Sequence, residues 1–269
     1  MLRAQSSVHV DLPRAGVVAR VEAPGYEDLA EAQVWAARLL AERGAPAARL
    51  FRPETRQPVV VENVAITLWH RLRPEDEPSY RGLGETLRLF HAATRDDPPS
   101  EVRALDPFKR ARGDLAWPSP YSGSETSAEL SRRLEVLALE WPAAAREDPL
   151  GSVVVHGDVH IENLMRKDDE RVLIDLEDAG VGPASWDLAP ISVQANRYGL
   201  PPARREEFLA GYGAEPGGWP GFDLMCQVYE IQSVCWAMRC SVESPRMAAE
   251  ATIRVDGLLH GGDRPWTLL

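Results

Sequence analysis

Residues 153–163 read Val-Val-Val-His-Gly-Asp-Val-His-Ile-Glu-Asn, and residues 172–178 read Val-Leu-Ile-Asp-Leu-Glu-Asp. Each stretch begins with three apolar residues, which predict a short buried strand. Asp158 and Asn163 lie in the turn-rich segment after the first strand, and Asp175 follows the second. Two short strands on either side of a loop would bring these three side chains to one point.

The three side chains are those that phosphoryl transfer requires. The protein supplies positioning and charge neutralisation in this reaction, with little covalent chemistry. One carboxylate accepts the hydrogen bond of the attacking hydroxyl, while an amide oxygen and a second carboxylate hold Mg²⁺. The interval of five residues from Asp158 to Asn163 is that of the kinase catalytic loop, H-R-D-x-x-x-x-N. We therefore expect Asp158 to act as the base and Asn163 and Asp175 to bind Mg²⁺.

The chain upstream of this motif predicts a ββαββ order. Two hairpins, each a pair of short β-branched runs, flank one amphipathic helix. The predicted strands are residues 8–12, 17–21, 58–61 and 65–69, and the predicted helix is residues 26–43.

Downstream of residue 72 the apolar spacing becomes helical, apart from the two short strands of the motif. Helices are predicted around residues 83–91 and 130–141 and from about residue 204 onward, with a loop at 117–123. Thr126 and Glu129 predict a capping box before the second of these helices. The fold class is α+β, with a small β-rich lobe over residues 1–72 and a larger, mainly helical lobe over residues 73–269.

The composition and the cysteines exclude several classes of protein. Of the 269 residues, 44% are hydrophobic and 26% are charged, and no apolar run is long enough to span a bilayer, so we expect a cytoplasmic protein with no membrane partner. Three cysteines, Cys226, Cys235 and Cys240, without paired Cys-x-x-Cys spacing argue against a disulfide framework or a zinc site.

The net charge of −11 excludes a general nucleic-acid binder. Residues 1–72 carry 8 acidic and 9 basic side chains, whereas the remainder carries 33 acidic and 21 basic ones. The acidic second part would attract a cationic acceptor, although the same charge could serve only to keep the protein in solution.

His156-Gly-Asp, Asn163 and Ile174-Asp175 together resemble the aminoglycoside phosphotransferase family, relatives of choline and fructosamine kinases that share the protein-kinase-like fold. The resemblance covers nearly the whole chain. It implies a bilobal fold in which His156 shapes the catalytic loop. It also implies that Asp187, within Gly-Pro-Ala-Ser-Trp-Asp-Leu-Ala at residues 182–189, braces that loop.

The same resemblance assigns residues to a nucleotide site for ATP or GTP. Arg20 occupies the place of the phosphate-binding lysine, and Glu31 on the following helix would be its ion-pair partner. Residues 68–72 correspond to the hinge that holds adenine, with Trp69, His70 and Leu72 as candidates. Because no G-x-G-x-x-G is present, Ser6, Ser7 and backbone amides are candidates for phosphate contacts.

The acceptor is expected to be a small molecule. Asp187 follows Asp175 by only twelve residues, which leaves no room for the activation segment of a protein kinase. Glu177 and Asp178 could bind the acceptor, or Asp178 could cap the next turn. His160 could support the loop or face the acceptor, and Glu230 could line its pocket.

The resemblance thus implies a Mg²⁺-dependent phosphotransferase acting on a cationic small molecule, such as an aminoglycoside or another amino-sugar antibiotic, in resistance or self-resistance. A metabolite kinase of the choline, fructosamine or homoserine type and a nucleotide-binding pseudokinase are the alternatives. A metallohydrolase built on His156, Asp158 and His160 is disfavoured, since the other four histidines lie in unrelated contexts. The protein could be a monomer or a homodimer.

Overall fold

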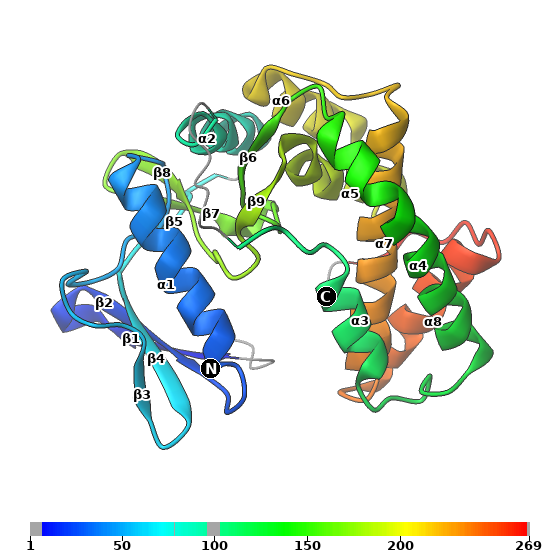
Figure 1. Ribbon diagram of the computed structural model, residues 1–269, viewed down its shortest axis with the longest axis horizontal. Helices are drawn as coiled ribbons and strands as arrows, with labels where there is room; N and C mark the ends of the chain where they lie inside the picture. Colours follow the sequence, from blue (N-terminus) through cyan, green and yellow to red (C-terminus); the bar gives the residue numbers. More distant parts are fainter. Residues whose placement is uncertain (1–6, 78, 96–102, 268–269) are drawn as a thin grey trace. The chain divides into compact units, whose positions relative to one another are not determined.

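The computed structural model in Figure 1 describes residues 7–77, 79–95 and 103–267. Its chain forms two compact units. The first comprises Met1–Leu105, Val153–Val181 and Glu207–Ala214, and the second comprises Asp106–Ser152, Gly182–Glu206 and Glu215–Leu269. The predicted division at residue 72 stays a prediction.

The first unit begins with a four-stranded antiparallel sheet in the order β1-β2-β4-β3. The strands are β1 (Ser7–Leu12), β2 (Val17–Glu22), β3 (Val59–Val61) and β4 (Val64–His70). A short 3-10 turn, Pro13–Ala15, joins β1 to β2 and ends at Gly16, whose φ of +66° favours glycine. Both predicted hairpins are confirmed.

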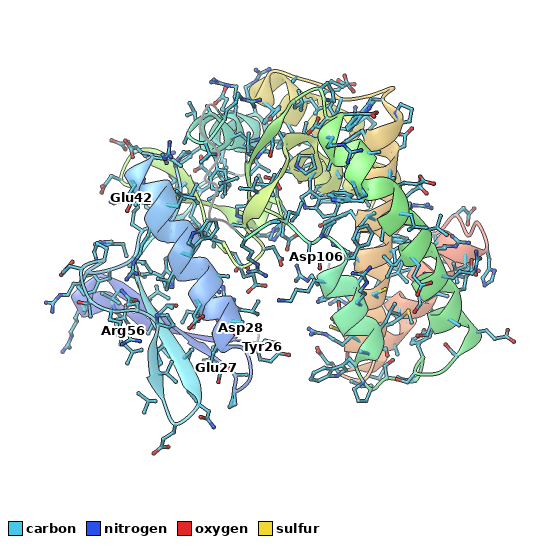
Figure 2. The ribbon with its side chains drawn as sticks, in the orientation of Figure 1. Tyr26, Glu27, Asp28, Glu42, Arg56 and Asp106 are labelled. Carbon is cyan, nitrogen blue, oxygen red and sulfur yellow. The ribbon has the colours of Figure 1, made fainter. Side chains whose placement is uncertain are left out.

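Helix α1 (Glu27–Glu42) lies between the two hairpins in sequence and completes the predicted ββαββ order. Its buried residues include Ala30, Gln33, Val34, Ala37 and Leu40, a stripe with helical spacing. The acidic side chains in its first turn, labelled in Figure 2, favour the positive end of the helix dipole.

The register of the sheet places three side chains in one row. His9 on β1 lies opposite Arg20 on β2, and Arg20 lies opposite Thr67 on β4. Residues directly opposite each other in an antiparallel pair point to the same face. Arg20 and Glu22, two positions apart on one strand, also share that face.

The remaining sheets of the first unit support the catalytic motif. β5 (Arg73–Pro74), β7 (Leu164–Lys167) and β8 (Glu170–Leu173) form one sheet, and β6 (Ser152–Val155) pairs with β9 (Gly180–Pro183). The predicted strands at 153–155 and 172–174 correspond to β6 and β8. β5, β7 and β9 were not predicted, since none of them contains a run of three apolar residues.

Helix α2 (Tyr80–Ala92) also belongs to the first unit, and it packs closely on residues 207–212 of α6 (Pro202–Tyr212). A Cβ at Gly84 would collide with the backbone of Phe208 and Tyr212, so only glycine allows this approach. Nδ1 of His91 lies 2.9 Å from the hydroxyl of Tyr212, which links the same two segments.

The second unit is a helical assembly around α7 (Pro220–Cys240), with α3 (Lys109–Ala116), α4 (Glu125–Arg146), α5 (Ala189–Arg197) and α8 (Pro245–Leu259) in contact with it. Figure 1 shows α7 in orange beside α3, α4 and α8. The rings of Trp141, Trp186 and Tyr229 meet edge to face in its core.

The start of α4 corrects one prediction. Ser124 is the N-cap, and its side chain accepts a hydrogen bond from the Ser127 amide. The predicted capping box of Thr126 and Glu129 is therefore wrong by two residues, because Ser124 supplies the first suitable oxygen in an extended conformation. Within the described part of the chain, no helix is long and apolar enough to cross a membrane.

Candidate active site

The predicted catalytic loop connects β6 to the 3-10 turn η2 (Ile161–Asn163). Gly157 begins the loop with a φ of +94°, a conformation that disfavours any side chain. A Cβ at this position would lie 2.6 Å from both Cβ and the carbonyl oxygen of Asp178. Glycine thus lets the loop pack against the segment that follows Asp175.

His156 ties the loop to β8. Its ring is fully buried, and Nε2 lies 2.7 Å from the carbonyl oxygen of Ile174, the residue before Asp175. Nδ1 accepts a longer hydrogen bond of 3.4 Å from the Asp158 amide. With Nδ1 as the acceptor, Nε2 is the ring nitrogen that donates to the Ile174 carbonyl. A structural role for His156, as the resemblance implies, agrees with this geometry.

Asn163 is held through its side-chain amide nitrogen. Nδ2 donates to the Asp158 carbonyl at 3.0 Å and lies 2.9 Å from Nε2 of His160. The Ile174 amide donates to the Asn163 carbonyl at 3.0 Å, which joins the loop to β8 a second time. With Nδ2 engaged in this way, Oδ1 of Asn163 remains as the acceptor that a hard cation requires.

His160 lies between the candidate base and a surface carboxylate. Nδ1 lies 3.0 Å from Oε2 of Glu162, and Nε2 lies 3.9 Å from Oδ2 of Asp158. Burial acts to lower the pKa of His160, but Glu162, Asp158 and Asp175 outweigh it, and the net effect raises the pKa. The Asp158 side chain keeps 25% of its surface exposed, so it can meet an incoming hydroxyl.

Arg20 joins the sheet to the segment after β8. Nη1 lies 2.6 Å from Oδ1 of Asp175, Nη2 contacts Oε2 of Glu177, and Nε lies 2.6 Å from Oε1 of Glu22. Arg20 is only 6% exposed. Burial works to lower its pKa, but the three carboxylates dominate and raise it. One cation thus faces three anions in this cluster.

The predicted pairing of Arg20 with Glu31 is wrong. Glu31 is exposed, whereas Glu22 and Gln33 are each 1% exposed. Nε2 of Gln33 donates to Oε1 of Glu22 at 3.2 Å, so α1 reaches Arg20 through Gln33 and Glu22. Glu31 does not reach Arg20 because it lies outside the buried stripe of α1, whereas Gln33 lies on that stripe. The apolar spacing of α1 was the signal that could have shown this.

His9 is a second residue that sequence analysis did not select. It lies opposite Arg20 across β1 and β2. Desolvation and the charge of Arg20 lower the pKa of its ring, while Asp175 partly offsets them. These influences place His9 close to the Arg20–Asp175 pair. Ser7 lies opposite Glu22 in the same register. Ser6 lies outside the described residues.

The hinge candidates Trp69 and His70 are the last residues of β4, and Leu72 lies just beyond it. The amide of His70 donates to the Arg49 carbonyl, and the amide of Arg71 donates to the Gly16 carbonyl. Nε1 of Trp69 donates to Oγ1 of Thr67, which orients the indole along the strand. An adenine ring would therefore have to use other backbone groups of this stretch, which ends at Leu72.

Two predicted site residues belong to the second unit. Asp187 is fully buried in the 3-10 turn η3 (Ala184–Leu188), and its bracing of the catalytic loop stays a prediction. Both carboxylate oxygens of Glu230 accept hydrogen bonds from Arg197, at 2.9 and 3.0 Å. Glu230 also lines a cavity of about 470 Å³ beside α4, together with Arg133.

The residues present suit a magnesium ion that is shared with a nucleotide. In the described residues there is no cluster of three or more His, Cys, Asp or Glu that could hold a metal by itself. Magnesium is commonly held by one or two protein oxygens, with phosphate and water completing its six ligands. The free Oδ1 of Asn163 and the carboxylate of Asp175 provide such a pair.

Comparison with known proteins identifies the family of this chain. The sequence matches the family model APH, "Phosphotransferase enzyme family", over residues 3–225. A search of curated proteins found no sequence that matches this chain.

Solved structures share the fold. Choline kinase LicA from Streptococcus pneumoniae is 13% identical, with a TM-score of 0.63 over 95% of this chain and 90% of its own. Aminoglycoside phosphotransferase APH(3'')-Id from Streptomyces rimosus is 17% identical, with a TM-score of 0.61 over 84% of this chain and 92% of its own. Amicoumacin kinase hAmiN, solved with AMP-PNP, Ca²⁺ and Ami, is 11% identical, with a TM-score of 0.68 over 93% of this chain and 83% of its own. The predicted protein-kinase-like α+β fold is confirmed.

Proposed function

The chain belongs to the phosphotransferase enzyme family APH, and from this premise we propose that it transfers the γ-phosphoryl group of ATP or GTP to a hydroxyl of a small molecule. One observation carries the proposal. Ile174 accepts at its carbonyl from His156 and donates its amide to the Asn163 carbonyl, and these contacts hold the loop bearing Asp158 against the segment bearing Asp175. In the proposal, this connection brings the base and the metal ligands together, as phosphoryl transfer needs.

Asn163 and Asp175 hold the metal in this proposal. Oδ1 of Asn163 and the Asp175 carboxylate would bind Mg²⁺, which supplies neutralisation of the triphosphate charge. His160 and the Asp158 carbonyl keep Nδ2 of Asn163 turned away from the cation. The amide oxygen is thereby oriented before nucleotide binds.

Arg20 binds the phosphates. Its Nη1 and Nη2 atoms contact Asp175 and Glu177. Phosphate oxygens can replace these carboxylates, because a guanidinium presents parallel donors that suit either group. Asp175 is then free to bind the metal. In the proposal, Arg20 would hold phosphate oxygens and Asp175 would hold Mg²⁺, which would supply charge neutralisation.

Asp158 aligns the acceptor. Its carboxylate accepts the hydrogen bond of the attacking hydroxyl and directs the oxygen for in-line displacement. The bond from the γ-phosphorus to the bridging oxygen breaks, the bond to the acceptor oxygen forms, and the hydroxyl proton passes to Asp158. The leaving group is the nucleoside diphosphate.

The acceptor is proposed to be cationic, such as an aminoglycoside or another amino-sugar antibiotic, because the chain beyond residue 72 is strongly acidic. A metabolite kinase of the choline, fructosamine or homoserine type is the alternative. Glu177 is engaged by Arg20, so we assign it to the nucleotide side of the site and not to the acceptor. His160 and Asp178 are kept as structural supports of the loop.

A coupled ADP-release assay tests the proposal. The wild-type protein with Mg²⁺ and ATP or GTP is screened against aminoglycosides, nucleoside and peptide antibiotics, choline and sugar amines. We expect one class to stimulate release, and Asp158→Asn to abolish that stimulation. Tight nucleotide binding without stimulation by any acceptor would instead support a pseudokinase. Failure to bind either nucleotide would refute the proposed function.

A further inference from the structure

We propose that Glu22 and Gln33 are the positioning residues that hold Arg20 for the nucleotide phosphates, in place of a glutamate on the helix. The inference rests on the proposed function and deepens its nucleotide site. The family resemblance assigned this task to Glu31, which is exposed. The structure gives it to a residue on the same strand as Arg20.

The contacts that support this role are short and buried. Oε1 of Glu22 lies 2.6 Å from Nε of Arg20, and Nε2 of Gln33 donates to the same oxygen at 3.2 Å. Glu22 and Gln33 are each 1% exposed. Hydrogen bonds that involve a charged partner are the stronger kind, and burial shields them from competing water. Gln33 thus fixes Glu22, and Glu22 fixes Arg20.

The position of these contacts on the guanidinium matters as much as their strength. Glu22 binds Nε, while Nη1 and Nη2 contact Asp175 and Glu177. A nucleotide can take over the two Nη atoms while Glu22 keeps its hold on Nε. A lysine ammonium is a single point charge and cannot divide its donors between two faces in this way. This division explains why arginine can serve in the lysine position here.

A neutral glutamine at position 33 suits the buried negative charge of Glu22. Burial raises the pKa of the Glu22 carboxyl, and the Arg20 charge and the Gln33 hydrogen bond oppose that effect. Oε2 of Glu22 is buried with no hydrogen-bond partner among the described residues. A second carboxylate at position 33 would add repulsion to this desolvated charge, whereas an amide donor stabilises it.

Calorimetric measurement of nucleotide affinity tests this role. The ligands are ATP or GTP, whichever binds the wild-type protein more tightly, and the corresponding nucleoside. Glu22→Gln keeps the shape but removes the charge. We expect it to weaken binding of the triphosphate about tenfold, the effect of losing one charge-assisted contact. Affinity for the nucleoside should stay unchanged, because Arg20 acts only on phosphate. A merely structural role would weaken both.

A second substitution should restore the triphosphate affinity that Glu22→Gln loses. In Glu22→Gln combined with Gln33→Glu, the carboxylate moves to α1, and we expect triphosphate affinity to return to within about threefold of wild type. Gln33→Ala alone removes the hydrogen bond that holds Glu22 and should weaken triphosphate binding about threefold. This variant replaces Glu22→Gln in the test if Glu22→Gln does not fold. Glu42→Gln, an exposed glutamate of the same helix, is the matched control.

Two outcomes would overturn the inference by itself. The first is unchanged triphosphate affinity in both Glu22→Gln and Gln33→Ala. The second is a loss of triphosphate affinity in Glu31→Gln but not in those two variants. Wild-type protein that binds neither nucleotide would overturn the proposed function and this inference together. The wild-type measurement therefore separates the two failures.

Discussion

Nη1 of Arg20 lies 2.6 Å from Oδ1 of Asp175, so the candidate phosphate ligand and the candidate metal ligand are paired with each other. The Arg20 side chain is 7% exposed and that of Asp175 is 38% exposed. The pair is therefore anchored on the arginine side and accessible on the aspartate side. The exposed carboxylate of Asp175 would hold the metal of a metal–nucleotide complex, while the buried Arg20 would hold its phosphates.

Asp175→Asn tests the metal side of this pair. The substitution keeps the size of the side chain but removes the charge that binds Mg²⁺ and Arg20. We expect Mg²⁺ to lose most of its effect on nucleotide affinity, since one of the two protein ligands is lost. Calorimetric titrations with and without Mg²⁺ measure this difference. An unchanged effect of Mg²⁺ in the variant would contradict the assignment of Asp175.

Asp158→Asn tests the base. Because Asp158 contacts the acceptor and not the nucleotide in the proposed mechanism, nucleotide affinity should remain near that of wild type. Turnover should fall by about 10²–10⁴-fold, the usual contribution of a positioned general base. Calorimetry for affinity and coupled ADP release for turnover provide the two measurements. Wild-type turnover in the variant would rule out the role.

Gly157→Ala tests the packing of the catalytic loop. The φ of +94° and the contact with Asp178 leave no room for a methyl group. We expect the free energy of unfolding to fall by about 1–3 kcal/mol or more, from strain and displacement of the loop. Chemical denaturation measures the change.

Gly113→Ala is its matched control. Gly113 lies within α3, and a Cβ there would meet nothing within 4 Å. Alanine should stabilise the helix by about 0.5–1 kcal/mol. Equal destabilisation by both substitutions would show that the loop geometry is not the cause.

The raised pKa of His160 predicts that the stability of the folded protein depends on pH. Burial acts to lower its pKa, but Glu162, Asp158 and Asp175 raise it above the ordinary value of 6.5. Because the folded state binds the proton more tightly, the stabilisation is complete below pH 6.5 and is lost as pH rises through the folded-state pKa. His160→Gln should remove this dependence.

Melting temperatures of the nucleotide-free protein between about pH 5.5 and about pH 8 measure it. The difference between wild type and His160→Gln should be larger at the acidic end. His260→Gln, at an exposed position after α8, controls for the general effect of losing a histidine. The same difference at both ends of the range would argue against a raised pKa.

Much of the fold was predictable because its signals are local. The turn residues at Pro13 and Gly16 and the β-branched runs beside them determine the first hairpin, and the stripe of α1 determines a helix. The spacing within a strand–loop–strand unit also predicts that Asp158, Asn163 and Asp175 form the site, and their roles stay predictions.

The sequence by itself determined which chemical groups the site contains and in what order they occur, because spacing within a strand–loop–strand unit restricts where side chains can go. Only the tertiary structure decided the partners of Arg20. Glu22, Gln33 and Asp175 come from a strand, a helix and a distant loop, and they meet because the buried stripe of α1 packs with Gln33 inward and Glu31 outward. The apolar spacing of α1 indicates which of its residues face inward, but the meeting of these residues with Arg20 depends on packing across the whole unit, which no local pattern of charges records.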